Sequence, residues 1–346
     1  MFLEGFGFTY PPFAGVVFAF FSFLSENALI ILWQVGMIGL LAAVIAMVIH
    51  ERGYRLTPLT LVVCALLPVA SIGNEAIHGT LFYGQINILL MFLVALDILP
   101  ARRRLPGVGI GIAAGLKLTP AYMGLVLLFQ RRWWAAVVSV ATFAVTVVIG
   151  YLFVRDANDY WIRAMLDSSR IGTSDNTGSK SVLSVLHCNF DVEGGWVWIL
   201  CVVVIFAVTC LALRTAMLRD NRSMAFALTG ISSCLISPFS WYHHFVWLVP
   251  LGIVLFLEVN EWIRQRVTNV WGKQLAGLGS LIAVIVFHIP FVAYTVWWEM
   301  SSRGLDYYST NIPWMNVLWT GLSFLFLVGY AVFGFIPRCR SSRRCA

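Results

Sequence analysis

Apolar residues fall into long runs along this chain, and short polar segments separate them. The runs are roughly as long as a membrane-spanning helix, which needs about 20 residues, and they are continuously apolar, whereas barrel strands would alternate. The pattern predicts an all-α polytopic membrane protein, with residues 1–346 forming a single membrane domain of about nine spanning helices. The predicted spans are 28–49, 58–74, 85–100, 133–154, 195–217, 224–239, 243–258, 275–298 and 313–336.

Two further apolar stretches do not read as simple spans. Residues 11–24 follow Pro11-Pro12 and cover only about half a bilayer. Residues 106–129 carry Lys117-Leu-Thr-Pro120 in their middle and have arginines on both sides. The second stretch predicts a re-entrant hairpin or a broken helix pair. Irregular backbone at that depth is tolerated only where protein or a water-filled cavity surrounds it.

Composition and charge set the class and the orientation of the chain. Of its residues, 60% are hydrophobic and 11% are charged, against about 25% charged in soluble domains, which excludes a soluble globule and a disordered protein. The positive-inside rule puts 17 of the 23 Lys and Arg in segments predicted to be cytoplasmic: 50–57, 101–105, 130–132, 214–223, 259–274 and 337–346. The net charge of +7 is therefore explained by basic residues on the cytoplasmic side of the membrane. No nucleic-acid partner is expected.

The same orientation predicts on which side of the membrane the two ends of the chain and its longest polar segment lie. The basic tail 337–346 is expected in the cytoplasm against membrane lipids, and residues 155–194 form a long exterior loop. The span 28–49 must then run inwards, although no signal peptide precedes it. A very short N-terminus can cross unaided, but the pattern favours a chain that lacks an upstream helix its relatives possess.

Ionisable and amide side chains inside these spans are costly and need a reason. Lys117 has no acidic neighbour in sequence and is expected to meet an anion such as a phosphate; snorkelling to the membrane surface is the alternative. Glu75, Gln85 and Asn87 lie at the exterior ends of two spans. They predict a cavity for a polar substrate, with helix capping and interhelical amide bonds as the alternative.

A histidine pair follows in the segment Ser237–Trp247. His243 and His244 point to different faces of a helix and lack the His-x-x-x-His spacing of a zinc helix, so no metal is expected. One of them is predicted to bind a phosphate or sugar hydroxyl, and Trp241 to stack on a sugar ring. An aromatic belt at the membrane interface is the alternative. The seven cysteines show no paired spacing, and no Walker or dinucleotide motif is present, so no cofactor is expected.

Four motifs, taken in order, are similar to those of a known family. They are Phe8-Thr-Tyr-Pro-Pro12, Glu75 with Tyr83-Gly-Gln85-Ile-Asn87, Gly115-Leu-Lys117-Leu-Thr-Pro120, and Ser237-Pro-Phe-Ser-Trp-Tyr-His-His244. Together they resemble glycosyltransferase family 87, the polyprenol-phosphate-mannose-dependent mannosyltransferases with the GT-C fold. Within it they resemble the bacterial α-1,2-mannosyltransferases that build phosphatidylinositol mannosides.

The resemblance implies a reaction and roles for particular residues. It implies inverting transfer of mannose on the exterior face of the bacterial cell membrane, from a polyprenyl-phosphate donor to a mannosylated glycolipid acceptor, with no metal. It assigns contacts with the donor phosphate or sugar to Lys117, His243 and His244. It places Gln85 and Asn87 in the cavity wall. Contacts with the acceptor or with the closing exterior loop fall to Tyr160, Trp161, Arg170 and Trp241.

Two departures from the family leave the catalytic base unassigned. The family's catalytic aspartate lies before the Thr-Tyr-Pro-Pro motif, where this chain has only seven residues ahead of Phe8, and Glu4 does not match the pattern. The resemblance therefore implies that the matching aspartate would lie upstream of Met1. The family's Asn-Gln-Ser-Leu is replaced by Gly178-Ser-Lys180-Ser-Val182.

Other interpretations stay open because of these departures. Glu75 is a substitute candidate for the base. A catalytically impaired, lipid-binding scaffold is one alternative to an enzyme. A transporter is another, although it predicts an inverted repeat that the sequence lacks.

Overall fold

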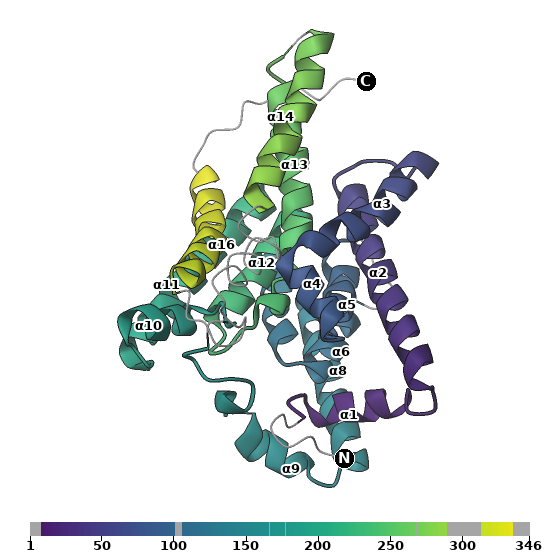
Figure 1. Cartoon of the computed structure of the whole chain (residues 1–346), viewed down its shortest axis with the longest axis vertical. Coiled ribbons are helices and arrows are strands. Elements are labelled where there is room, and N and C mark those ends of the chain that lie inside the picture. Colours follow the sequence, from purple (N-terminus) through teal and green to yellow (C-terminus); the bar gives the residue numbers. More distant parts are fainter. Residues whose placement is uncertain are drawn as a thin grey trace, which may run out of the picture.

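The computed structural model describes residues 8–100, 106–165, 167–176, 178–267, 269–288 and 313–334. Over these ranges the chain is helical, and its one β-type feature is an isolated bridge between Ser179 and Trp241. The principal helices are α1 (Pro12–Ala19), α2 (Glu26–Glu51), α3 (Pro58–Ala70), α4 (Glu75–Phe82), α5 (Asn87–Ile98), α6 (Val108–Leu116), α7 (Gly124–Phe129), α8 (Trp133–Phe153), α9 (Ala157–Asp159), α10 (Val182–Phe190), α11 (Gly195–Leu218), α12 (Arg222–Ile236), α13 (Leu248–Arg264), α14 (Val270–His288) and α16 (Pro313–Phe333). Figure 1 shows their arrangement.

The prediction of an all-α polytopic membrane protein is confirmed, but the count of about nine spans is not. Within the described ranges, four helices are long and apolar enough to cross a membrane: α2, α8, α11 and the Asn316–Phe333 part of α16. The pair α4 and α5 makes a fifth candidate if the two helices, bent by 116°, form one broken span.

Three of the predicted spans form helices of 13 to 17 residues whose bounds differ from the prediction, and turn-forming residues explain two of the ends. α12 stops at Ile236 because the next residues are Ser237-Pro238, and the residue before a proline disfavours the helical conformation. α13 begins only at Leu248, because Tyr242–His244 form a 3₁₀ turn. α3 is 13 residues long and continues as a 3₁₀ turn to Gly73.

Several sequence-based expectations fall outside the described residues. These include the part 289–298 of the predicted span 275–298 and the basic tail 337–346. Met1 and Glu4 also lie outside them. The expectation that a catalytic aspartate would lie upstream of Met1 therefore stays a prediction.

The two irregular stretches are short or broken, as the sequence predicts. α1 has only eight residues, and in Figure 1 it lies across one end of the bundle beside α8. Residues 106–129 form α6, a 3₁₀ turn at Thr119–Met123 and α7. The break falls at Lys117, whose φ and ψ of −155° and 130° are extended.

α12 is the central helix of the described bundle. Every residue from Ser223 to Leu235 is buried, and the helix contacts α11, α13 and α16. Its apolar composition therefore reflects packing against protein rather than against lipid. The two ends of α12 lie in different surroundings, which we call the clamp and the cavity.

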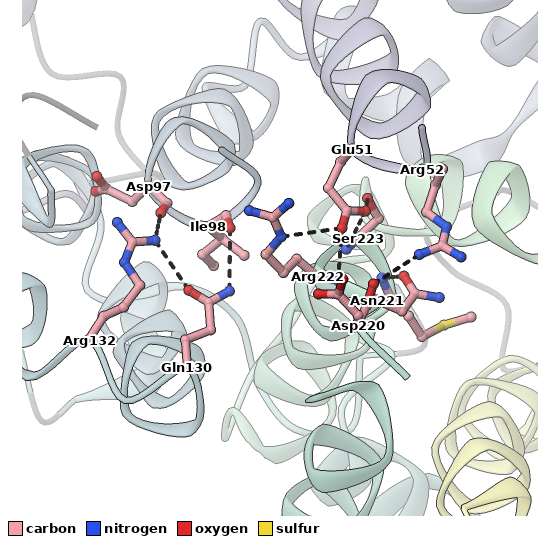
Figure 2. Close-up of polar contacts among 11 residues, drawn as sticks. Glu51, Arg52, Asp97, Ile98, Gln130, Arg132, Asp220, Asn221, Arg222 and Ser223 are labelled. Atoms are coloured by element: carbon pink, nitrogen blue, oxygen red, sulfur yellow. Dashed lines mark hydrogen bonds and ion pairs between the residues drawn. The ribbon is translucent and has the colours of Figure 1, made fainter. Parts of the chain in front are cut away.

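The clamp consists of Glu51, Asp97, Arg132, Arg222 and Ser223, with the groups bonded to them (Figure 2). The Glu51 carboxylate is 2% exposed and accepts from Arg222 Nε at 3.3 Å, Ser223 Oγ at 2.5 Å and the backbone N–H of Ser223 at 3.2 Å. A carboxylate at this point also neutralises the positive N-terminal end of α12. Glu51 thereby ties the end of α2 to the start of α12.

Asp97 joins three more helix ends on the same side. Its fully buried carboxylate accepts from the backbone N–H groups of Gly107 at 2.8 Å and Ile110 at 2.7 Å, which caps α6. Arg132, just before α8, donates to the Asp97 carbonyl at 2.6 Å. The clamp thus fixes the end of α5 and the starts of α6, α8 and α12. The opposite ends of α5, α6 and α12 lie at the cavity.

Candidate active site

A cavity of about 860 Å³ lies where α5 begins and where α6 and α12 end. Segments far apart in sequence line it, from the residues before α1 to the turn between α12 and α13. The lining residues are Thr9, Tyr10, Pro11, Tyr83, Gln85, Lys117, Leu118, Thr119, Tyr122, Tyr160, Met165, Arg170, Ile171, Ser233, Ile236, Ser237, Pro238, Phe239, Trp241, Tyr242, His243 and His244.

Lys117 supplies the central charge of the cavity. Its Nζ lies 2.8 Å from His244 Nε2 and 3.2 Å from Asn87 Oδ1, and it sits 5.9 Å from the centre of the Tyr10 ring. Among the described residues that line the cavity, none is an aspartate or a glutamate. Because a cation away from water needs a compensating charge, this end of the bundle is suited to an anionic ligand.

The 3₁₀ turn Tyr242–His244 carries both histidines, and α4 and α5 hold it in place. The carbonyl of His243 accepts from Thr80 Oγ1 at 2.9 Å and from Asn87 Nδ2 at 2.8 Å. Gly79 allows this close approach, because a Cβ there would lie 2.4 Å from the Tyr242 ring. The second bond also fixes the Asn87 amide, so that its oxygen faces Lys117.

One wall of the cavity is aromatic. The Trp241 and His243 rings stack with 6.0 Å between centroids and 13° between planes, and Tyr83 lies 5.7 Å from His243. The bridge to Ser179 holds Trp241, with backbone bonds from Lys180 N to Ser240 O at 2.7 Å and from Tyr242 N to Gly178 O at 3.0 Å. The long loop between α8 and α11 therefore closes against the histidine turn.

The structure brings most of the predicted site residues into this cavity. Seven of them line it: Gln85, Lys117, Tyr160, Arg170, Trp241, His243 and His244. Gln85 accepts from Tyr10 Oη at 2.8 Å, and Arg170 donates to the Phe8 carbonyl at 2.9 Å. Asn87 lines a small recess behind Lys117.

Glu75 and Trp161 do not line the cavity. Glu75 is 5% exposed at the start of α4, and its charge acts on Tyr83 in the wall and on Lys180 behind it. Trp161 packs against Phe143 of α8, with 6.0 Å between ring centroids. Over the described ranges, no three His, Cys, Asp or Glu side chains gather as metal ligands would.

Sequence reasoning missed two residues with a part in the site, Tyr10 and Ser240, and also the buried contacts of Lys180 behind its wall. Tyr10 and Ser240 lie inside two of the quoted motifs, so their position in those motifs was the available signal. Lys180 gave a weaker signal, as a departure from the family pattern. Its Nζ donates to Asn316 Oδ1 of α16 at 2.5 Å. Burial lowers the pKa of Lys180 to about 8, and the nearby Glu75 charge opposes that shift only in part.

A model of glycosyltransferase family 87 matches residues 8–238. The chain belongs to glycosyltransferase family 87. The match contains Lys117 and the polar residues at the start of α5, and it ends within the Ser237–His244 motif. The resemblance carried by the four motifs is confirmed, and the protein is a membrane glycosyltransferase of this family.

Curated relatives of the chain come from mycobacteria. It is 30% identical over 313 residues to the polyprenol-phosphate-mannose-dependent alpha-(1-2)-phosphatidylinositol pentamannoside mannosyltransferase of Mycolicibacterium smegmatis, covering 87% of this chain and 73% of that protein. It is 29% identical over 342 residues to the polyprenol-phosphate-mannose-dependent alpha-(1-2)-phosphatidylinositol mannoside mannosyltransferase of Mycobacterium tuberculosis, covering 94% of this chain and 77% of that protein. No solved structure matches the chain significantly.

Proposed function

We propose that this chain transfers mannose from a polyprenyl-phosphate donor to a mannosylated glycolipid acceptor, with inversion at the anomeric carbon. The reaction is placed on the exterior face of the bacterial cell membrane, with the C-terminus in the cytoplasm. The observation that carries the proposal is the Lys117 ammonium, held by Asn87 and His244 at a cavity whose described lining contains no carboxylate. The names of the mycobacterial relatives supply the donor and the sugar.

The charge of Lys117 fits the chemistry of the leaving group. A polyprenyl-phosphate sugar is a phosphodiester with one negative charge, and breaking its bond to the anomeric carbon adds a second charge to the phosphate. A fixed cation beside that phosphate stabilises the charge that develops in the transition state. Lys117 is therefore assigned to the donor phosphate, with Asn87 and His244 orienting its ammonium group.

The rest of the cavity fits the sugar and the lipid. Its volume of about 860 Å³ falls within the range of about 300–1,000 Å³ for small-molecule sites. Trp241 and His243 offer a stacked aromatic wall to a sugar ring. Leu118, Tyr122 and Ile236 form an apolar edge, and Leu118 is 39% exposed. This edge is assigned to the first isoprene units of the donor.

The proton of the acceptor hydroxyl must pass to a base as the oxygen bonds to the anomeric carbon. The resemblance implies a carboxylate for this step, in the family an aspartate, and none lines the described part of the cavity. Glu75 lies behind the wall at 5% exposure, so its geometry does not support direct proton transfer from an acceptor in the cavity. Residues of the cavity are therefore assigned to the donor, and Glu75 is not assigned as the base.

The experiment is a transfer assay in proteoliposomes with radiolabelled polyprenyl-phosphate mannose and a phosphatidylinositol mannoside acceptor. The unaltered chain is expected to form a labelled glycolipid, and Lys117→Met to form about 100-fold less. Lys180→Met is the matched control, because this lysine lies behind the cavity wall and is expected to keep transfer within about threefold.

Three other outcomes would overturn the proposal. Equal transfer by Lys117→Met would remove Lys117 from the donor site. Donor binding that depends on Lys117, with no transfer by the unaltered chain, would replace the enzyme with the lipid-binding scaffold. Movement of the donor between leaflets without transfer would favour the transporter.

A further inference from the structure

Ser240 connects the exterior loop to the cation of the cavity. It is 1% exposed and does not line the cavity, but its Oγ lies 3.1 Å from His244 Nδ1. Two loop residues hold its backbone: the N–H of Ser240 donates to Ser179 Oγ at 3.2 Å, and its carbonyl accepts from the N–H of Lys180 at 2.7 Å. The loop thereby sets the position of the Ser240 hydroxyl.

The hydrogen bonds around His244 have a definite direction. A charged lysine only donates, so the 2.8 Å contact requires His244 Nε2 to accept from Lys117 Nζ. A neutral imidazole that accepts at Nε2 carries its hydrogen on Nδ1. That hydrogen is then donated to Ser240 Oγ. The bond made by one ring nitrogen thus sets the state of the other.

The other states of His244 conflict with these contacts. A hydrogen on Nε2, in the second neutral tautomer or in the imidazolium, would face the lysine ammonium at 2.8 Å. His243 lies beside it with 5.0 Å between ring centroids, and Cys234 Sγ donates to the His244 carbonyl at 3.4 Å. Neither neighbour offers Nδ1 a substitute for the Ser240 hydroxyl.

We propose that Ser240 is a positioning residue: its hydroxyl accepts the Nδ1 hydrogen that the Lys117 contact imposes on His244 and so fixes the orientation of the ring, so that Nε2 aims the Lys117 ammonium into the cavity. The proposal extends the proposed function, since it assumes that Lys117 meets the donor phosphate. It gives the loop segment Gly178–Val182 a definite role, because the loop sets the direction of the cation through Ser240 and His244.

Removing the hydroxyl should affect turnover more than donor binding. The attraction between Lys117 and a phosphate depends weakly on direction, whereas the hydrogen bond to the charge that develops on the leaving group depends on it strongly. Ser240→Ala is therefore expected to lower kcat about tenfold, with the donor KM within about threefold. Ser240→Thr keeps the hydroxyl and should recover most of the rate.

The matched control is Ser139→Ala. Ser139 is a buried serine of α8 whose hydroxyl donates to the Ala136 carbonyl of its own helix. Its kcat should stay within about twofold of the unaltered rate. Equal losses in Ser240→Ala and Ser139→Ala, or a Ser240→Ala effect confined to KM, would contradict the proposal.

The decisive readout does not depend on turnover. ¹⁵N NMR of the full chain labelled at its six histidines, with His244 assigned by its loss in His244→Gln, reports which ring nitrogen is protonated. We expect a protonated Nδ1 and an unprotonated Nε2 in the unaltered chain, and in Ser240→Ala the same tautomer with a shifted Nδ1 resonance, because its hydrogen has lost its acceptor. A protonated Nε2 in the unaltered chain overturns the positioning role even if transfer occurs. The expected tautomer without any transfer would instead refute the proposed function.

Discussion

α12 begins at the clamp and ends at the cavity, and charged groups are compensated differently at these two places. At the clamp, Glu51 accepts from Arg222 and Ser223, and Asp97 caps α6. At the cavity, Lys117 contacts the neutral partners Asn87 and His244, and no carboxylate is found in the described lining. The charged groups of the clamp have partners within the chain. The Lys117 ammonium instead lies at a cavity that a ligand can fill.

This difference has an energetic basis. Breaking a buried ion pair leaves an uncompensated charge and is strongly destabilising, so clamp residues are expected to matter mainly for folding. A buried cation with neutral partners lowers the stability of the protein without ligand, and binding of an anion offsets this cost. Lys117 is therefore expected to matter mainly for function.

The largest expected effect tests the cavity side of the comparison. Lys117→Met should lower mannose transfer about 100-fold, since one directed cation is lost from the leaving group. It should not lower the Tm, because the substitution removes a buried charge and keeps a long side chain. Transfer assays and thermal unfolding on the same detergent preparation check both parts. A lower Tm with normal transfer would make Lys117 a structural residue.

The clamp should respond in the opposite way. Glu51→Gln removes the charge that faces Arg222 and the start of α12, and is expected to cost about 3 kcal/mol of unfolding free energy. The donor KM should stay within about twofold. Adding Arg222→Met should recover part of the loss, because no unpaired charge is then left. A Glu51→Gln chain with full stability but a raised KM would break the comparison.

A smaller effect is expected at the aromatic wall. Trp241→Ala should lower kcat/KM about tenfold by removing the surface against which a sugar ring stacks, and Trp241→Phe should recover much of the loss. Trp134→Ala is the control, because Trp134 on α8 is 71% exposed and lies outside the cavity lining. Equal effects of the two alanine substitutions would show that the loss is not specific to the wall.

The smallest effect concerns Lys180, which is intermediate between the clamp residues and Lys117. Its hydrogen-bond partner Asn316 is neutral, but the charge of Glu75 lies close enough to affect its pKa. Burial lowers its pKa from 10.5 to about 8, so between these values the unfolded chain binds more protons than the folded chain. Stability should therefore rise with pH across that window. The Tm of the unaltered chain minus that of Lys180→Met is expected to increase from about pH 8 to about pH 10. A decrease would contradict the lowered pKa.

The sequence was sufficient for the class of fold and for the main break in it. Continuous apolar runs predicted membrane helices, and Lys117-Leu-Thr-Pro120 predicted the interruption between α6 and α7. The number of spans could not be obtained in this way. Apolar residues look alike whether they face lipid or protein, and α12 is apolar because it is buried inside the bundle.

The residues that line the cavity were predictable where a motif contains them, whereas the contacts that packing creates between them were missed. Lys117, His243 and His244 were expected at one site, and they line one cavity. The bond from Ser240 to His244 was not predicted, because local spacing does not show which ring nitrogen faces which hydroxyl. The pair of Glu51 and Arg222 joins residues 171 positions apart, and only the packing of α2 against α12 brings them together.

The most direct test of the central claim is the affinity of polyprenyl phosphate for the full chain in nanodiscs, with Lys117→Met and Lys180→Met measured alongside. If the Lys117 cation is compensated by the donor phosphate, Lys117→Met should raise the Kd at least about tenfold, as expected for the loss of a charged hydrogen bond. Lys180→Met should leave the Kd within about twofold. Equal Kd values for the unaltered chain and Lys117→Met would contradict the account.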